Sequence, residues 1–236
     1  MNSSPNIGFL YFIMNTEKRP KKNLWIDHMN SHEALVTMLE NQMESFNAVK
    51  LAIREIEKAT KLIVNNLVKF DQSRIIYIGA GTSGRIGVQD GVELYPTFGW
   101  PKNRIDYVIA GGLSSLTCSV EGAEDDEKEA VNNVKKLNIV KGDIIIGLSA
   151  SGNTPFVITA LKEAKSFGAL TVGISNNPDQ KIQTLSDLSI TLDTGPEIIA
   201  GSTRLKAGTA QKICLNMIST LCMTKLGKVK DGLMIN

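Results

Sequence analysis

The sequence has few cysteines, little net charge and no long hydrophobic run. Its three cysteines, Cys118, Cys214 and Cys222, are scattered without a CxxC pair, which argues against a disulfide framework and favours a reducing cytoplasm. The 26 basic residues nearly balance the 24 acidic ones, so we expect no nucleic-acid partner. The apolar run 7–14 is too short to span a bilayer, and we expect no membrane attachment.

A helical arm is expected over residues 14–70, ahead of an α/β domain. Leu35, Leu39 and Met43 recur at four-residue spacing, which is typical of an amphipathic helix. Ser31 is the expected N-cap, but the glutamate that completes a capping box is missing three residues later.

From residue 71 to 236, short apolar runs alternate with helical patterns. The expected strands are 74–78, 105–110, 143–148, 171–175 and 188–192, and the expected helices are 83–94, 123–137, 154–167, 181–185 and 206–226. Apolar runs without polar alternation indicate strands that are buried on both faces. The sequence therefore predicts a doubly wound, five-stranded parallel sheet with helices on both faces.

A glycine-rich segment follows the first expected strand. Residues 79–84, "GAGTSG", match the G-x-G-x-x-G pattern of dinucleotide-binding proteins. Such a site also needs an acidic residue at the end of the second strand, to bind the ribose hydroxyls. That strand ends in the Ala-Gly-Gly of residues 110–112, and Asp106 lies at its opposite end. We therefore do not expect NAD.

Hydroxyl side chains make this loop suitable for another kind of phosphate. Thr82 and Ser83 stand at an expected helix N-terminus, where free N–H groups and the helix dipole favour an anion. A second Ser/Thr/Gly turn follows the strand 143–148, and the two turns should converge at the edge where α/β sheets bind ligands. The alternative is that these hydroxyls only cap helices. The candidate ligand-binding residues are Gly81, Thr82, Ser83, Ser149, Ser151 and Thr154.

Two hydroxyl-rich loops without a Walker lysine or a metal motif indicate a sugar phosphate as the small-molecule partner, with neither a metal ion nor an organic cofactor. The loops resemble those of the sugar isomerase (SIS) domain. Longer stretches from Thr16 onwards resemble, more specifically, the N-acetylmuramic acid 6-phosphate etherases. These stretches are "TEKRP", "IYIGAGTSGRIGV", "PTFG", "IAGG", "VEGAEDD", "SASGNTPFV", "TVGISNNP", "GSTRLKAGTAQK" and "LGKV".

The resemblance implies a reaction and two catalytic residues. The D-lactyl ether at C3 of N-acetylmuramic acid 6-phosphate would be cleaved by elimination and hydration to N-acetylglucosamine 6-phosphate and D-lactate, in cell-wall amino-sugar recycling. Glu93 resembles the proton donor to the departing lactate, and apolar neighbours in sequence suit that role because they raise the pKa of a carboxyl group. Glu124 resembles the second catalytic glutamate, which acts in deprotonation.

Other residues are weaker candidates, and each has an ordinary alternative. Glu197 and Lys206 are candidate substrate ligands, and Lys206 would meet the lactyl carboxylate or the phosphate, or lie on a solvated helix start. The acidic run around Glu124 could simply complement a helix dipole, and Glu93 could be a helix-end carboxyl.

The sequence departs from the etherase pattern at three places. The resemblance begins near Met14, so we expect residues 1–13 to be a disordered or artefactual leader. The relatives usually continue beyond "LGKV" as a helical region that these 236 residues lack. Around Glu93, "QDGVELYPTFG" replaces the more usual "LDASECPPTFG".

The spacing between Ser83 and Glu93 raises a geometric question. Ten residues of straight helix span about 15 Å, which is more than the distance from the phosphorus to C3 of a hexose phosphate. Either the helix breaks near Gly91, or each site is built by two subunits. The long N-terminal helices and the dimeric character of the etherases favour a homodimer with shared sites.

Two other functions fit the phosphate loops. A non-catalytic phosphosugar-sensing regulator would use both loops but has no need of two glutamates. An aldose–ketose sugar-phosphate isomerase shares proton abstraction at C2 but needs no acid at C3. Release of D-lactate separates the etherase from both alternatives.

Overall fold

A five-stranded parallel sheet forms the centre of the protein. The computed structural model describes residues 14–235, so the expected leader 1–13 lies outside the described residues. The strand order is β2-β1-β3-β4-β5, and all neighbouring pairs are parallel. The strands are β1 (Ile75–Gly79), β2 (Ile105–Ile109), β3 (Ile144–Ser149), β4 (Leu170–Ser175) and β5 (Leu188–Thr191). The doubly wound sheet is confirmed, and every strand boundary lies within one residue of its expected place.

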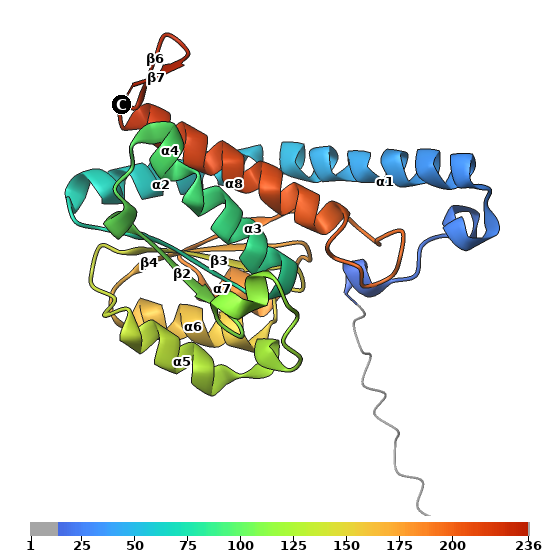
Figure 1. Ribbon diagram of the computed structural model, residues 1–236, viewed down its shortest axis with the longest axis horizontal. Coiled ribbons are helices and arrows are strands. Elements are labelled where there is room, and N and C mark those ends of the chain that lie inside the picture. Colours follow the sequence, from blue (N-terminus) through green and yellow to red (C-terminus); the bar gives the residue numbers. More distant parts are fainter. Residues whose placement is uncertain (1–13, 236) are drawn as a thin grey trace, which may run out of the picture.

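Helices cover both faces of the sheet, as Figure 1 shows. One face carries α2 (Ile53–Lys69), α3 (Gly81–Val92), α4 (Leu94–Phe98) and α8 (Lys206–Lys225), and the other carries α5 (Glu127–Lys136), α6 (Pro155–Ser166) and α7 (Lys181–Leu185). Alternate residues of β1 enter the two separate hydrophobic clusters: Tyr77 packs on the α8 side and Ile76 on the α6 side. Burial on both faces explains why the strands read as continuous apolar runs.

The N-terminal helices are α1 (Ser31–Leu51) and α2, which meet at Ala52. The expectation that Ser31 caps α1 was wrong. Asn30 is the N-cap: its side chain accepts a hydrogen bond from the Glu33 N–H at 3.0 Å, and the Glu33 carboxylate accepts one from the Asn30 N–H at 3.4 Å. A complete capping box is therefore present, one residue earlier than expected.

Short elements connect and end the main ones. The 3-10 helices are Asn15–Glu17, Lys22–Leu24, Ile26–His28, Lys102–Arg104, Leu113–Leu116 and Ala123–Asp125, and a hairpin of β6 (Val229–Lys230) and β7 (Leu233–Met234) follows α8. Within residues 14–235, none of the helices has the length and apolar character needed to cross a membrane.

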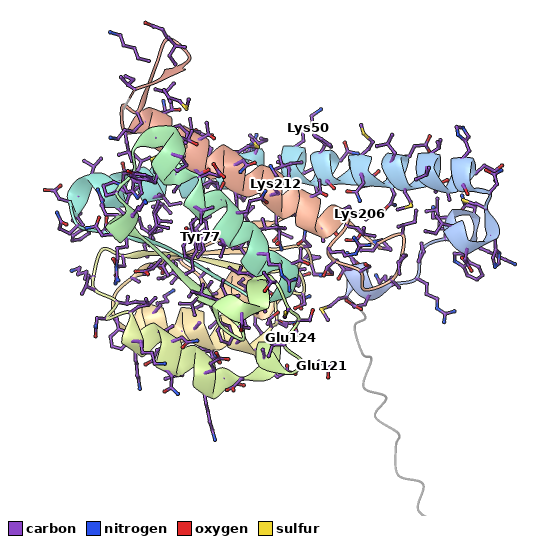
Figure 2. The ribbon with its side chains drawn as sticks, in the orientation of Figure 1. Lys50, Tyr77, Glu121, Glu124, Lys206 and Lys212 are labelled. Carbon is purple, nitrogen blue, oxygen red and sulfur yellow. The ribbon has the colours of Figure 1, made fainter. Side chains whose placement is uncertain are left out.

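A buried carboxylate joins β1, α3 and α8. Tyr77, which lies between the sheet and α3 in Figure 2, donates a hydrogen bond to Asp90 at 2.8 Å. The Asn216 amide and the Ser219 hydroxyl donate to the other oxygen of the same carboxylate at 2.7 and 3.0 Å. Burial and the charge of Asp90 raise the pKa of Tyr77 well above its usual value, so its hydroxyl keeps its proton. The network fixes α3 and α8 to the strand.

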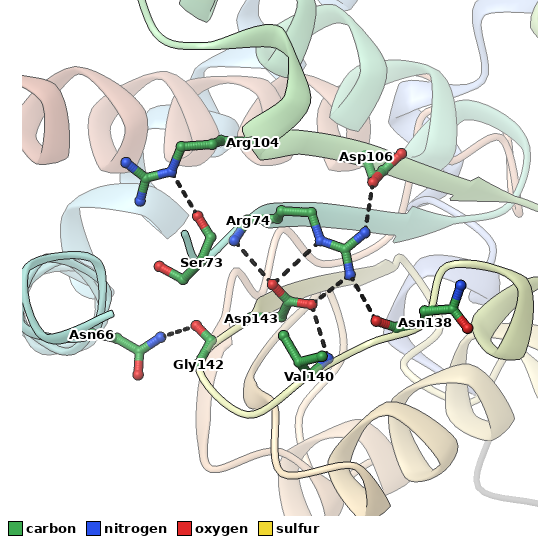
Figure 3. A network of polar contacts seen from close by, with 9 residues as sticks. All are labelled: Asn66, Ser73, Arg74, Arg104, Asp106, Asn138, Val140, Gly142 and Asp143. Carbon is green, nitrogen blue, oxygen red and sulfur yellow. Dashed lines mark hydrogen bonds and ion pairs between the residues drawn. The ribbon is translucent and has the colours of Figure 1, made fainter. Parts of the chain in front are cut away.

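A second polar network ties together the amino ends of β1, β2 and β3 (Figure 3). The buried Asp143 carboxylate accepts hydrogen bonds from the Arg74 guanidinium at 2.6 Å, from the Arg74 backbone at 3.0 Å and from the Val140 backbone at 3.1 Å. The Asp143 hydrogen bond raises the pKa of Arg74 above its usual value. Arg74 also pairs with Asp106 at 3.1 Å. Asp106 therefore lies at the amino edge of the sheet. Its carboxylate cannot reach a ribose bound at the carboxyl edge.

We expect Asp143→Asn to destabilise the fold by about 3 kcal/mol, because it removes the fully buried partner of the Arg74 guanidinium, whose side chain is only 18% exposed. Urea unfolding followed by circular dichroism measures the loss. Asp106→Asn is the matched control, since the Asp106 side chain is 36% exposed and such pairs contribute about 1 kcal/mol or less. Equal losses in both variants would contradict this interpretation.

Candidate active site

The loop after β1 owes its shape to glycines. A side chain on Gly79 would lie 2.6 Å from the backbone nitrogen of Gly84, and Gly81 has a φ of +52°. Close strand-to-helix contact and a left-handed turn are two of the reasons for glycine in the dinucleotide fingerprint. The same backbone turn thus produces the same spacing of glycines, although β2 is followed by the Ala-Gly-Gly of residues 110–112 and not by the acidic residue of the dinucleotide fingerprint.

The hydroxyls of the two loops do not cap the helices that follow. The N-caps of α3 and α6 are Ala80 and Thr154, and within residues 14–235 neither helix has a side-chain cap hydrogen bond. The alternative that these residues serve only as helix caps is therefore wrong for both loops. The first-turn N–H groups remain available to an anion, and both helix dipoles favour one there.

Three hydroxyls of the second loop converge on one another. The Ser149 hydroxyl lies 2.8 Å from that of Thr154 and 3.2 Å from that of Ser151. The Gly152 N–H donates to the Ser149 hydroxyl at 2.9 Å, and the Asn153 N–H donates to the Ser151 hydroxyl at 3.2 Å. These hydroxyls accept from the loop amides, so their own protons can be donated to a phosphate oxygen.

Both loops line a single cavity of about 430 Å³ at the carboxyl ends of β1 and β3. This volume lies within the usual range for small-molecule sites. The sequence-predicted residues that line it are Gly81, Thr82, Ser83, Glu124, Ser149, Ser151 and Thr154. The strand order reverses between β1 and β3, which makes this the topological switch point where open α/β sheets bind ligands.

The acidic run divides into two parts with different positions. The helix expected over 123–137 begins only at Glu127, because residues Ala123–Asp125 form a 3-10 turn. Asp126 caps α5 by accepting the Glu129 N–H at 2.8 Å, which is the ordinary role of an acidic residue at a helix start. Glu124, labelled in Figure 2, and Asp125 instead line the cavity.

The structure separates Glu93 from the cavity within one chain. The helix ends near Gly91, as expected if a break in the helix were to bring Glu93 to the ligand. Glu93 nevertheless lies at the far end of α3 and does not line the cavity. Twelve residues of helix span about 18 Å. The expected apolar enclosure is also wrong within one chain: Leu94 is buried in the core, whereas Glu93 and its neighbours Val92 and Tyr95 are exposed.

Glu197 and Lys206 lie beside the N-terminus of α8 rather than on the cavity wall. The fully buried Glu197 carboxylate accepts the N–H groups of Lys206 at 3.2 Å and Ala207 at 2.9 Å. Burial raises the pKa of Glu197 despite these donors. Lys206, seen at the start of α8 in Figure 2, is 3% exposed, and burial lowers its pKa against the attraction of Glu197. Together they anchor α8.

Sequence reasoning missed several residues of the cavity wall. Glu17, Asn153 and Thr203 line the cavity, and so does Gly201. Both "TEKRP" and "GSTRLKAGTAQK" carried the family resemblance, but neither Glu17 nor Thr203 was assigned a role from it. Residues that are neighbours in one motif therefore lie in different surroundings, some on the cavity wall and others away from it. The spacing of residues within the motif does not predict which of them line the cavity.

The sheet topology and the paired loops define a SIS-domain protein. The family described as "Glucokinase regulatory protein N-terminal SIS domain" matches residues 55–165, and the SIS domain family matches residues 113–221. An E. coli CFT073 protein solved in complex with A5P has a TM-score of 0.61 at 18% identity, covering 86% of this chain and 97% of that one. A phosphoheptose isomerase from Francisella tularensis has a TM-score of 0.62 at 14% identity, covering 83% and 100%. These likenesses establish the fold.

A curated relative from Shouchella clausii, named N-acetylmuramic acid 6-phosphate etherase, is 46% identical over 224 residues. The alignment covers 94% of this chain and 75% of the relative. A Geobacillus thermodenitrificans protein of the same name is 44% identical over 221 residues, with 94% and 74% covered. The chain belongs to the N-acetylmuramic acid 6-phosphate etherase family.

We expect Ser83→Ala and Ser151→Ala each to weaken sugar-phosphate binding by about 1–3 kcal/mol, because each removes a hydrogen bond to a charged group. Titration calorimetry with N-acetylglucosamine 6-phosphate measures the change. Ser166→Ala is the matched control, because Ser166 lies at the far end of α6 and bonds the Glu163 carbonyl. Unchanged affinity in both loop variants would mean that the phosphate binds elsewhere.

Proposed function

We propose that this protein cleaves the D-lactyl ether of N-acetylmuramic acid 6-phosphate and releases D-lactate and N-acetylglucosamine 6-phosphate. The observation that carries the proposal is a hydroxyl-lined cavity at the switch point of a chain 46% identical to a named etherase. The test is direct: the purified protein is incubated with N-acetylmuramic acid 6-phosphate, and D-lactate is assayed. Binding without D-lactate would favour a phosphosugar-sensing regulator, and formation of a ketose phosphate would favour an isomerase.

The cavity supports a binding mode for the phosphate. Its oxygens accept hydrogen bonds from Ser83, Ser149, Ser151 and Thr154 and face the N-termini of α3 and α6. None of the described residues that line the cavity is Lys or Arg, so hydroxyls, backbone N–H groups and helix dipoles supply the stabilisation. Glu197 and Lys206 contribute by fixing the start of α8 beside Thr203, which lines the cavity.

The steps of the reaction follow from the fact that an ether oxygen is a poor leaving group. Opening the pyranose exposes an aldehyde at C1, which acidifies the proton on C2. Glu124 removes that proton, and Glu93 protonates the C3 oxygen as the lactate departs. Water then adds to the unsaturated aldehyde and restores the hydroxyl at C3. A positioned acid or base contributes roughly 10²- to 10⁴-fold to such steps.

Glu93 can take part only if a second subunit completes the site. We therefore propose a homodimer in which Glu93 of one chain approaches the cavity of the other. Exposed Val92 and Tyr95 beside Glu93 give a covering chain an apolar surface to pack on, and such cover would supply the low-polarity surroundings that a proton-donating carboxyl needs.

The helical arm 14–70 provides a further surface for dimerisation. Leu35, Leu39, Met43 and Phe46 are spaced as one face of α1 and are 66%, 71%, 57% and 56% exposed. Figure 1 shows α1 extending beyond the sheet, and these four side chains are exposed although α1 also packs on α8. An apolar stripe of this kind is typical of an interface between helices.

The protein is proposed to work in the cytoplasm. Cys214 and Cys222 are buried free thiols and Cys118 is an exposed one. A reducing compartment keeps such thiols free.

The two glutamates should differ in an isotope experiment. We expect Glu124→Gln to stop exchange of the C2 proton with deuterated water and also D-lactate release, because both follow deprotonation. Glu93→Gln should block D-lactate release but leave the exchange running, because enolate formation precedes the step that Glu93 assists. Each loss should be about 10²-fold or more. NMR of the C2 position and a D-lactate assay measure the two steps.

Glu121→Gln is the control for both variants, because Glu121 belongs to the same exposed acidic run but does not line the cavity. The reverse pattern, with exchange lost in Glu93→Gln and retained in Glu124→Gln, would swap the two roles. Full activity in both variants would remove this mechanism.

The homodimer should be lost in the double variant Leu39→Glu, Met43→Glu, because two charges in the α1 stripe oppose burial. Size-exclusion chromatography with light scattering should give a monomer, whereas Leu113→Glu, at a site 70% exposed and away from α1, should remain dimeric. A dimer in the double variant would exclude the stripe as the interface.

Shared sites should also allow complementation. Mixing inactive Glu93→Gln with an inactive Ser83→Ala, Ser151→Ala protein should restore part of the activity, since a heterodimer holds one complete site. No recovery despite confirmed subunit exchange would assign each site to a single chain.

A further inference from the structure

The segment before the first long helix forms part of the cavity wall. Met14 and Glu17 line the same cavity as the two hydroxyl loops, although they are far from those loops in sequence. Glu17 ends the 3-10 turn Asn15–Glu17, and its side chain is exposed at the cavity. Its carboxylate is therefore available to a ligand in that cavity.

Thr16 fixes this segment in place. It is fully buried, and all its polar groups are paired. Its N–H donates to the Asn177 side chain at 3.2 Å, its hydroxyl accepts from the Asn177 amide at 3.0 Å, and its carbonyl accepts from the Gly201 N–H at 3.0 Å. Asn177 also donates to the Ala150 carbonyl at 2.8 Å, in the loop after β3. The backbone beside Glu17 is thus tied to one of the phosphate-binding loops.

Gly201 makes room for the Glu17 carboxylate. A side chain on Gly201 would lie 2.7 Å from Oε2 of Glu17, and Gly201 also has a φ of +75°. The left-handed backbone favours glycine at this position, and the absence of a side chain leaves space beside the carboxylate. The Glu17 carboxylate therefore lies beside a second cavity-lining loop, next to a backbone segment that Thr16 holds in place.

We propose that Glu17 is a specificity-determining residue that accepts a hydrogen bond from a hydroxyl of the bound sugar. This inference rests on the proposed function, because it takes the ligand to be a sugar phosphate held by the serine loops. A carboxylate repels a phosphate and is an acceptor only. Sugar hydroxyls are donors, so Glu17 faces the sugar and not the phosphate.

A hydrogen bond from the sugar to Glu17 predicts different effects of a Glu17 substitution on the binding of a sugar phosphate and of inorganic phosphate. We expect Glu17→Gln to raise the dissociation constant for N-acetylglucosamine 6-phosphate about tenfold, because the neutral amide oxygen of glutamine accepts a weaker hydrogen bond than a carboxylate does. Binding of inorganic phosphate should stay unchanged or become tighter, because a negative charge near the anion has gone. Glu17→Asp, which keeps the charge but shortens the side chain, should weaken the sugar phosphate and leave inorganic phosphate unchanged. Titration calorimetry on the full chain measures both ligands.

Glu121→Gln is the matched control, and it should change neither dissociation constant. Equal weakening of both probes in Glu17→Gln would overturn the proposal, because it would mean that Glu17 supports the loops instead of contacting the sugar. Unchanged binding of N-acetylglucosamine 6-phosphate would overturn it as well. Failure of the etherase function has a different signature: the wild-type protein would bind the sugar phosphate, and Glu17→Gln would weaken it, but no D-lactate would be released from the substrate.

Discussion

The parallel pairing of β1 with β3 is the constraint on which the candidate site depends. Gly79 and Leu148 are partners at the carboxyl ends of these strands, so the two following loops emerge side by side, about 4.8 Å apart at the strands. The chain leaves β1 towards β2 and returns on the other side at β3. The helices α3 and α6 therefore lie on opposite faces of the sheet, and the crevice between their N-termini is where the hydroxyls gather.

The cavity separates two kinds of chemistry. Hydroxyls and helix N-termini gather at the strand ends, whereas Glu17, Glu124 and Asp125 supply carboxylates to the same cavity from other segments. In the binding mode that we propose, a phosphate held by uncharged donors leaves these carboxylates free for the sugar, where hydroxyls donate hydrogen bonds and a carbon-bound proton is removed. A lysine beside the phosphate would instead pair with the carboxylates and compete with both tasks.

Buried polar groups hold this arrangement together from outside the cavity. Asp143 and Arg74 join the amino ends of the strands, opposite to the site, and Asp90 binds α3 and α8 to β1. Glu197 caps α8 and thereby sets the start of that helix beside Thr203. Asp143 and Asp90 bind partners from distant parts of the chain, whereas Glu197 accepts the N–H groups of the first two residues of α8, in the following segment. Glu197, a candidate substrate ligand in the sequence, is thus a buried carboxylate with its hydrogen bonds made inside the protein.

The sequence by itself determined the strands, the doubly wound order and the two hydroxyl-rich loops that meet at one cavity, because buried apolar runs and glycine turns are set by local backbone chemistry. It also identified the family, through motifs that extend along most of the chain. The tertiary structure decided which polar residues share the cavity. Glu17 enters it through the Thr16–Asn177 contact, whereas Glu93 leaves it because α3 carries it to the opposite end. Such positions depend on packing between distant segments, which the spacing of residues along one chain does not encode.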